Sequence, residues 1–378
     1  MNIDISYTEA LGRASLRLQK KMQHSVKLLQ KAQGIALAYD QRGGYYLAFS
    51  GGKDSQALFH IAQLAGVTFK AHMNLTSVDP PEVIRFVKRH YPEVELIKPK
   101  KSIYDLAVEK QILPSMRVRW CCAEYKEMSG AGKVTLIGIR HQESSRRAKR
   151  NEVEISSRKF SGTFEGFEDY RTELLQKKHA NKHKQAQTSV NITNATEERT
   201  LGCIGGKESL LVSPIIHWTE DDVWEFLTKV VQVPHCELYD QGFHRIGCIG
   251  CPMSNIRQKI RENERWPHVK RNWIRAIMRI RAGGGIIRQT YSRPRQNSEG
   301  AELLQNTGYI AHPDPAHWMA QKREYRTVGG FSDSSSSNGL TEERELEIAE
   351  NIYDWWISGR SYKKWYADKF LQLKLFED

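Results

Sequence analysis

The chain has 378 residues, 39% of them hydrophobic, which is enough to bury a substantial core in one large domain or two smaller ones. It has no apolar run of membrane-spanning length, and its first residues lack the basic and apolar regions of a secretory signal. We therefore expect a cytoplasmic protein with reduced thiols and no membrane partner, in which the six cysteines do not form a disulfide framework.

The net charge of +13 is concentrated between residues 255 and 295. Twelve Lys and Arg side chains there face only two Glu, which leaves a local excess of ten positive charges. Such a segment is typical of a surface that binds nucleic acid, and Trp266, Trp273 and Tyr291 within it would suit base stacking. An ordinary solvated helix face, with its aromatic residues in the core, explains the same pattern.

The first element expected is a helix over residues 8–40, because apolar side chains recur at helical spacing among Lys, Arg and Gln. Gly43 and Gly44 end this pattern. The apolar stripe consists of Leu11, Leu16, Leu18, Met22, Val26, Leu28, Leu29, Ala32 and Ile35.

A strand and a helix joined by a glycine turn follow. An aromatic-rich apolar run predicts a buried strand over 45–49, and helical spacing resumes after Ser55. Gly51 and Gly52 allow a tight turn, and a helix N-terminus favours an anion, most often a phosphate. This is not the Walker pattern, and an ordinary strand-to-helix turn is the alternative.

The side chains of this turn suit a phosphate ligand. Lys53 supplies a full positive charge, and Ser50 and Ser55 supply hydroxyl donors. Asp54 is either a Mg²⁺ ligand or a helix cap. The Ser-Gly-Gly-x-Asp-Ser pattern resembles the pyrophosphate loop of the adenine-nucleotide alpha-hydrolase superfamily.

Further strands are expected over 68–75, 95–98, 133–140 and 210–216, with helices between them. This alternation predicts an α/β fold with a doubly wound parallel sheet. Ligands of such sheets bind beyond the C-terminal strand ends, where the loop at 50–55, Gly138 and Arg140 all fall.

The remaining segments set the domain boundaries. Residues 157–207 are polar and weakly periodic, and we interpret them as an insertion or a mobile lid. We expect an N-terminal helical segment (1–41), a nucleotide-binding domain (42–254), a basic helical region (255–331), a Ser-rich linker (332–340) and a C-terminal helical segment (341–378).

The cysteines suggest a metal site. Cys121 and Cys122 are adjacent, and Cys248 and Cys251 form a C-x-x-C flanked by glycine. Thiolates select zinc or iron–sulfur clusters, while a C-x-x-C alone also suits redox chemistry. Buried reduced thiols are the alternative for Cys203 and Cys236.

Taken together, the ordered motifs over about residues 25–255 resemble the phosphoadenosine/adenosine phosphosulfate (PAPS/APS) reductase family. They are Ser-Gly-Gly-Lys-Asp-Ser at 50–55, Trp-Cys-Cys at 120–122, Gly-Ile-Arg at 138–140 with Glu143-Ser144 and Arg146-Arg147, Trp218-Thr219 with Asp222-Val223-Trp224, and Leu-Tyr-Asp-Gln-Gly at 238–242 leading into Gly-Cys-Ile-Gly-Cys-Pro at 247–252.

This resemblance implies a [4Fe–4S] cluster held by Cys121, Cys122, Cys248 and Cys251, with Cys236 as a competing ligand. The reductases of this family also use a nucleophilic cysteine near the C-terminus, and no cysteine follows Cys251 here. Sulfate reduction by the family's usual route therefore lacks its nucleophile.

The resemblance leaves three functions open. The first is an ATP pyrophosphatase-type sulfurtransferase, similar to the sulfurtransferase of DNA phosphorothioation systems, in which Lys53 with Arg140 or Arg147 neutralises charge. Glu143 would then act as a base or a Mg²⁺ ligand, or only pair with Arg146 or Arg147. The second is an oxidoreductase that acts on phosphosulfate nucleotides with a thiol supplied in trans. The third is a nucleotide-binding regulatory module that works through a partner protein.

Overall fold

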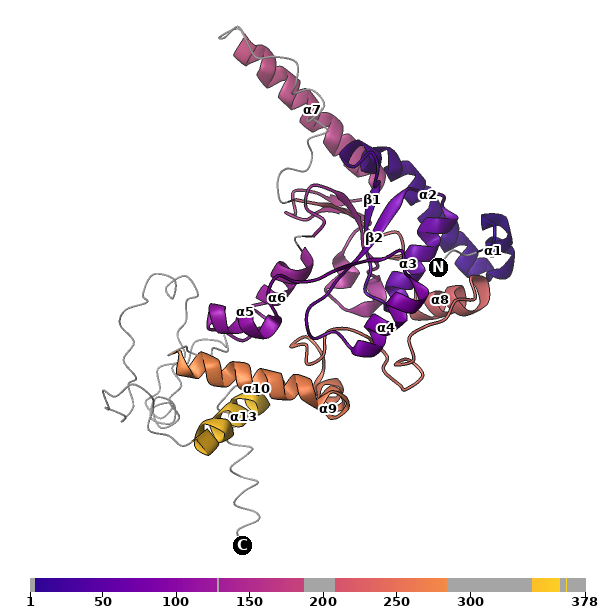
Figure 1. The fold of residues 1–378 in the computed structure, drawn as a ribbon. Helices are drawn as coiled ribbons and strands as arrows, with labels where there is room; N and C mark the ends of the chain where they lie inside the picture. Colours follow the sequence, from indigo (N-terminus) through magenta and orange to yellow (C-terminus); the bar gives the residue numbers. More distant parts are fainter. Residues whose placement is uncertain (1–3, 128, 187–207, 284–341, 361–364, 366–378) are drawn as a thin grey trace. The chain divides into compact units, whose positions relative to one another are not determined.

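A computed structural model describes residues 4–127, 129–186, 208–283, 342–360 and 365 (Figure 1). Cys203, Tyr291 and the Ser-rich linker at 332–340 lie outside these residues. The chain forms two compact units, which we call the sheet unit and the helical unit. The sheet unit consists of Met1–Leu75, Pro80–Lys98 and Glu124–Gly247, and the helical unit of Thr76–Asp79, Pro99–Ala123 and Cys248–Asp378.

The sheet unit is built on seven strands in the order β3-β2-β1-β4-β7-β5-β6. The first five are parallel, and β5 and β6 pair antiparallel at one edge. Their bounds are Tyr45–Ala48 (β1), Phe69–Asn74 (β2), Glu95–Ile97 (β3), Val134–Leu136 (β4), Val153–Ile155 (β5), Ser161–Gly162 (β6) and Leu210–Val212 (β7). The predicted α/β class with a mainly parallel, doubly wound sheet is confirmed.

Strand β1 lies at the centre, between β2 and β4. Leu47 is in register with Ala71 of β2 and with Leu136 of β4, and all three side chains are buried. Because the chain moves from β1 to one side of the sheet and returns on the other side with β4, the C-terminal ends of β1 and β4 form the topological switch point. The loops that follow these two strands therefore lie next to each other.

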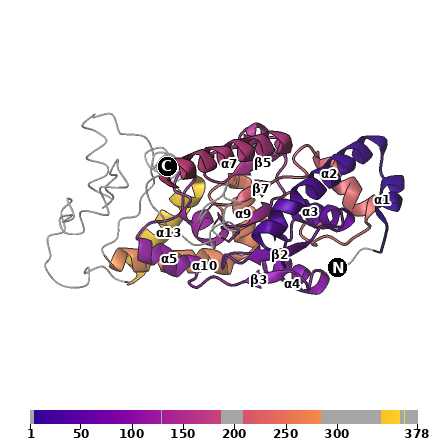
Figure 2. The same ribbon diagram turned by 90° about the horizontal axis from the view of Figure 1, so that it is seen from above.

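Helix α2 packs against β1, β4 and helix α3 (Figure 2). The single N-terminal helix that we expected is two helices, because Ser15 interrupts it and caps α2 by accepting a hydrogen bond from the Leu18 N–H. Leu16, expected in the apolar stripe, is 78% exposed. The helices of this unit are α1 (Tyr7–Arg13), α2 (Leu16–Tyr39), α3 (Lys53–Leu64), α4 (Pro81–His90), α7 (Phe164–Ala186) and α8 (Glu220–Glu225).

The polar segment at 157–207 contains regular structure in its first half. Strand β6 extends the sheet edge, and the 23-residue helix α7 runs away from it (Figure 1). Glu165 in the first turn of α7 forms an ion pair with Lys31 of α2. Helix α7 was not predicted from the sequence because its apolar residues do not follow a helical period.

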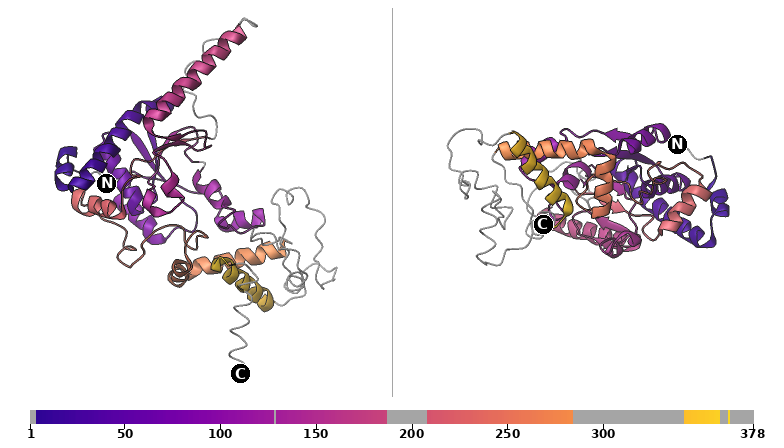
Figure 3. Two further views of the ribbon diagram at one scale, coloured as in Figure 1. Left: turned by 180° about the vertical axis from the view of Figure 1, so that it is seen from behind. Right: turned by 90° about the horizontal axis from the view of Figure 1, so that it is seen from below.

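Helix α10 is the centre of the helical unit and contacts α5, α9 and α13 (Figure 3). Trp273 of α10 packs on Trp356 of α13 with ring centroids 4.9 Å apart, and on Tyr104 of α5 at 5.0 Å. Trp266 and Trp273 are 4% and 2% exposed, so these rings form core rather than a base-stacking surface. The helices are α5 (Ile103–Lys110), α6 (Trp120–Cys122), α9 (Ile256–Arg265), α10 (Pro267–Ala282) and α13 (Glu342–Ser358).

No helix in the part of the chain that the structure describes combines the length and apolar character needed to cross a membrane.

Candidate nucleotide site and cysteine group

The turn between β1 and α3 depends on its glycines. Gly51 has φ +72°, and a Cβ there would lie 2.6 Å from a methyl group of Val83. Gly52 is the N-cap of α3, and no side chain caps the helix there. The first N–H groups of α3 are thus kept free of side-chain caps from the loop itself, as an anion site requires.

The two serine hydroxyls of the loop hold its shape. Ser55 Oγ donates to the Gly52 carbonyl oxygen at 2.8 Å and accepts the Ser50 N–H at 3.2 Å. The Ser50 hydroxyl lies 3.2 Å from the same Ser55 oxygen. Both hydroxyls therefore contribute to loop geometry before any ligand arrives.

Tyr239 closes the N-terminus of α3. Its hydroxyl accepts the Lys53 N–H at 2.8 Å, and the Lys53 Nζ atom lies 5.5 Å from the centre of its ring. Burial raises the pKa of Tyr239, so the phenol stays neutral. We did not single out Tyr239 in the sequence, although it lies in the Leu-Tyr-Asp-Gln-Gly motif at 238–242.

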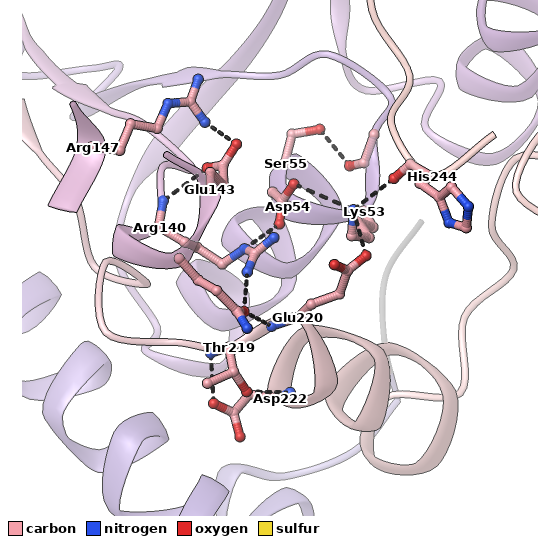
Figure 4. Close-up of polar contacts among 12 residues, drawn as sticks. Lys53, Asp54, Ser55, Arg140, Glu143, Arg147, Thr219, Glu220, Asp222 and His244 are labelled. Atoms are coloured by element: carbon pink, nitrogen blue, oxygen red, sulfur yellow. Dashed lines mark hydrogen bonds and ion pairs between the residues drawn. The ribbon is translucent and has the colours of Figure 1, made fainter. Parts of the chain in front are cut away.

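Lys53 points into the sheet unit rather than to solvent. Its side chain is 5% exposed, and Nζ donates to the His244 carbonyl oxygen at 3.1 Å (Figure 4). Nζ also lies 3.3 Å from Glu220 Oε1 and 4.0 Å from Asp54 Oδ2. The sequence predicted the acidic first turn of α8 only as a helix start, and it did not predict that Glu220 would contact Lys53.

Arg140 connects the two loops of the switch point. Its Nε atom donates to Asp54 Oδ1 at 2.6 Å, and the residue is 3% exposed. Gly138 lies against the same helix turn, since a Cβ there would come within 2.9 Å of the Asp54 carbonyl oxygen. The Asp54 carboxylate thus holds an arginine in this structure.

Glu143 and Arg147 form the next layer of charge. Glu143 Oε1 accepts the Arg140 N–H at 2.9 Å, and its other oxygen forms an ion pair with Arg147 (Figure 4). Of the roles weighed from the sequence, pairing with an arginine is the one seen in the structure. Arg140 and Arg147 therefore each face a carboxylate, as Lys53 does.

This arrangement is a site in which three cations are already matched by three carboxylates. Lys53 faces Glu220, Arg140 faces Asp54, and Arg147 faces Glu143. A phosphate that binds one of these cations shares it with its carboxylate or displaces that carboxylate. Glu220 is the one most easily displaced, because its side chain is 47% exposed against 23% for Asp54 and 14% for Glu143.

Asp222 has a structural role beside this site. It forms a capping box with Thr219 and is fully buried, with Lys21 Nζ 2.5 Å and Arg17 Nε 3.0 Å from its oxygens. Burial favours the neutral acid, but hydrogen bonds from Lys21 and Thr219 outweigh it and lower the pKa of Asp222. The ion pairs of Asp222 with Lys21 and Arg17 join α2 to the start of α8.

The four paired cysteines all belong to the helical unit. A hydrogen bond with Cys122, then burial and the charges of Cys122, Cys248 and Cys251, raise the pKa of the Cys121 thiol. The Cys121 thiol is therefore close enough to the other three to be influenced by their charge. Cys236, the competing ligand, is fully buried and belongs to the sheet unit.

Polar groups surround these thiols. Arg119 donates to Cys122 Sγ at 3.1 Å, and the Thr76 hydroxyl lies 3.5 Å from Cys248 Sγ. The indole Nε1 of Trp120 is buried and has no hydrogen-bond partner in the structure. Donors of this kind stabilise negative sulfur.

The C-x-x-C loop has a second source of rigidity. Gly250 adopts φ +68°, and its N–H donates to Glu262 of α9 at 2.7 Å. Glu262 is 2% exposed and also accepts from Gln258 at 2.7 Å. On the other side of the loop, the Ile249 N–H donates to the Val78 carbonyl oxygen at 2.8 Å.

Four thiols from one unit are a donor set that suits an iron–sulfur cluster. One tetrahedral ion would need its ligand atoms close together. Among the described residues, no three cysteine sulfurs form a group whose atoms all lie within 4.8 Å of one another. A cubane places its four thiolates on four separate iron atoms, which are farther apart. The unpartnered Trp120 N–H is available to a cluster sulfide.

Comparison with known proteins agrees with the fold and the loop. The family profile described as "Phosphoadenosine phosphosulfate reductase domain" matches residues 44–254, more than half of the chain. An uncharacterised protein of Methanocaldococcus jannaschii is 24% identical over 70% of this chain and 54% of its own length. The adenosine 5'-phosphosulfate reductase of Oceanobacillus iheyensis is 52% identical over 12% of this chain and 18% of its own length.

Among solved structures, the FMN adenylyltransferase of Candida glabrata aligns over 65% of this chain and 68% of its own, with a TM-score of 0.37 and 14% identity. The sheet and its switch-point loop define a nucleotide-binding α/β protein of the adenine-nucleotide alpha-hydrolase type. Within that class, the chain belongs to the phosphoadenosine phosphosulfate reductase family.

Proposed function

We propose that this chain is an enzyme that binds an adenine nucleotide, either ATP or a phosphosulfate nucleotide, at residues 50–55 and uses it in sulfur transfer. The observation that carries the proposal is the buried Lys53 at a helix N-terminus left uncapped by its own loop. A lysine side chain that is only 5% exposed at a helix N-terminus is better placed to bind an anion than to interact with solvent.

In the ATP form of the reaction, the loop holds the β- and γ-phosphates. An acceptor oxygen would form a bond to the α-phosphorus, the bond from the α-phosphorus to the α–β bridging oxygen would break, and pyrophosphate would leave. A bound Mg²⁺ would neutralise part of the negative charge of that pyrophosphate. Lys53, Arg140 and Arg147 would stabilise the negative charge that develops on the phosphate oxygens. Asp54 and Glu143 act here as positioning residues, since each holds one of these arginines.

We propose Cys121, Cys122, Cys248 and Cys251 as the ligands of a [4Fe–4S] cluster. Arg119, Thr76 and the Trp120 N–H would stabilise its negative charge, and Glu262 would keep the C-x-x-C loop in place. Because four cysteines would ligate all four irons, such a cluster would supply iron that binds sulfur for transfer only where one of these thiolates is displaced. Cys236 is the weaker candidate because it belongs to the other compact unit.

The sulfur acceptor that we favour is a nucleic acid. We expect it to bind through contacts to its phosphates rather than through base stacking. Several cations of α9 and α10 are already used within the helical unit, because Lys270, Arg279 and Arg281 pair with Asp354, Asp105 and Glu345. Arg271 and Arg275 are exposed one helical turn apart on α10. If they contact phosphates, Arg271→Ala and Arg275→Ala should each reduce the salt dependence of binding by about one unit of slope.

Anaerobic purification followed by iron and sulfide analysis tests the cluster, and calorimetry against ATP and the phosphosulfates tests the nucleotide. We expect about four irons per chain and pyrophosphate release from ATP that Lys53→Ala abolishes. The proposal that this chain is an enzyme would be refuted if the purified protein held no iron or sulfide and released no pyrophosphate with any acceptor.

Two other outcomes identify the alternatives. Release of sulfite from a phosphosulfate nucleotide, only when thioredoxin or glutathione is added, would identify a reductase that takes its thiol in trans. Nucleotide binding without turnover, combined with nucleotide-dependent binding of a partner protein such as a sulfur donor or regulator, would identify the regulatory module.

A further inference from the structure

Two imidazoles and a carboxylate converge in the sheet unit, outside the nucleotide loop. The Nε2 atoms of His24 and His217 lie 2.6 and 2.9 Å from the same oxygen, Oε1 of Glu152. The three ligand atoms all lie within 4.8 Å of one another, and no other three histidine, cysteine or acidic residues in the described part of the chain meet so closely.

Each of the three residues stands on a fixed backbone. His24 lies in the middle of α2, one residue before the fully buried Ser25. Glu152 precedes β5, and its carbonyl oxygen accepts the Ser213 N–H at 2.8 Å at the end of β7. His217 precedes Trp218, which is 1% exposed and donates to Ser25 at 3.1 Å. His24 thus stands on a helix, while Glu152 and His217 lie in short loops that packed or hydrogen-bonded neighbours hold in place.

The three side chains of the group differ in their exposure to solvent. The Glu152 side chain is 13% exposed, while those of His24 and His217 are 49% and 48% exposed. An ion can therefore arrive from solvent through the imidazoles and meet a carboxylate that is largely shielded from water. Shielding strengthens the attraction between that carboxylate and a cation.

From this geometry we propose that His24, Glu152 and His217 bind one divalent metal ion of the zinc class. Imidazole nitrogen with one carboxylate oxygen is a donor set that suits Zn²⁺, Co²⁺ and Ni²⁺. In a tetrahedral zinc site the ligand atoms are roughly 3.3 Å apart, given metal–ligand distances of about 2.0–2.1 Å. The present nitrogen–oxygen separations need to widen by less than an ångström, which side-chain rotation provides.

A third histidine, His141, lies beside the group without joining it. The ring of His141 lies edge-on to that of His217, with centroids 5.1 Å apart. Its Nε2 is hydrogen-bonded to the Arg150 carbonyl oxygen at 2.8 Å. Three protein ligands leave one position of the ion for water. The ion would join α2 to the β5–β7 edge of the sheet, so its first effect is on the stability of that edge.

Cobalt titration of the full chain tests the site, because Co²⁺ reports its ligands by absorption. Thiolate ligands give an intense near-ultraviolet charge-transfer band, which imidazole and carboxylate do not, so binding at the cysteines is recognised separately. We expect visible d–d bands that appear without that charge-transfer band and disappear when Zn²⁺ is added. His24→Gln and His217→Gln should each weaken cobalt binding by about 100-fold or more. This loss is larger than that expected for a residue that only hydrogen-bonds to a metal ligand.

His268→Gln, at an exposed histidine of α10, is the matched control and should leave the cobalt bands unchanged. Zn²⁺ should also raise the unfolding temperature of the wild type but not that of the His24→Gln variant. Two results would overturn the proposal: no cobalt binding other than the thiolate type in the wild type, or bands that survive loss of both histidines. Either would leave the group as an ion pair only.

Discussion

The Nε atom of Arg140 donates a hydrogen bond to Oδ1 of Asp54 at 2.6 Å. This contact joins the segment after β4 to the first turn of α3, so the two loops of the switch point act as one piece. Arg140 is 3% exposed, and losing its partner would leave a charge that water reaches poorly.

A double-mutant cycle on this pair should show strong coupling. Asp54→Asn and Arg140→Gln each leave one unpaired group, so each should lower the free energy of unfolding by about 1–3 kcal/mol. The double variant should lose less than the sum, with a coupling of about 0.5–3 kcal/mol measured by urea unfolding. The exposed Glu9–Arg13 pair of α1 is the control, with an expected coupling of about 0.2–0.5 kcal/mol. Simple additivity at Asp54 and Arg140 would contradict this account.

Glu220→Gln should tighten nucleotide binding. The Glu220 carboxylate lies 3.3 Å from Lys53 Nζ and competes with an incoming phosphate. Because Glu220 is half exposed, the gain in ATP affinity should be no more than about fivefold, which corresponds to about 1 kcal/mol. Asp221→Asn removes the same charge from the next, exposed position and should have a smaller effect in the same calorimetric titration. Equal gains from both variants would mean a general charge effect rather than competition for Lys53.

Asp222→Asn should destabilise the protein at neutral pH by about 3 kcal/mol, since it leaves Lys21 and Arg17 beside a neutral group. The pKa of Asp222 is lowered in the folded state, so its stabilising effect is present above the unfolded value of about 3.9 and is lost as the pH falls through the folded value. The gap between wild type and variant, measured by unfolding at several pH values, should therefore narrow only in strong acid. A gap that does not narrow at any pH below about 3.9 at which the protein is still folded would contradict a lowered pKa of Asp222 in the folded state.

Glu262→Ala should loosen the C-x-x-C loop. The buried Gly250 N–H loses its acceptor, at a cost of about 1–3 kcal/mol, and Gln258 loses one hydrogen bond. Iron content after anaerobic reconstitution should fall with it. Glu264→Ala, on the exposed face of the same helix, should change neither stability nor iron content. Full iron loading of Glu262→Ala would show that the loop does not need this support.

Gly250→Ala tests the backbone of the same loop. A methyl group there has room, with the Ile357 side chain 3.7 Å away, so the cost comes from φ +68° alone. We expect a loss of about 1–2 kcal/mol in the free energy of unfolding. Gly247→Ala is the control, because nothing lies within 4 Å of its added Cβ and its φ is not in the left-handed region. A neutral Gly250→Ala would show that the loop readily changes conformation.

The sequence predicted the parallel strands because each is a short apolar run beside glycine or proline signals, and β1 and β2 agree within one or two residues. It did not predict β5 and β6, since strands of three and two residues leave almost no periodic pattern. It identified Lys53 and Arg140 by their motifs. Their partners were harder to foresee: Glu220 and Tyr239 reach Lys53 from more than 160 positions away, and only the fold brings such residues together.

The two compact units are interleaved along the chain. Each consists of three stretches, so the backbone passes from one unit to the other five times. Cys121 and Cys248 thus belong to different stretches of the helical unit, with the whole of the sheet unit's third stretch between them in the sequence. A fragment that ends at residue 254, where the family match ends, would keep all four paired cysteines but lose α9, α10 and α13. Limited proteolysis should therefore not release either unit as one continuous peptide. For the same reason, neither unit could be transferred to another protein as one continuous segment of sequence.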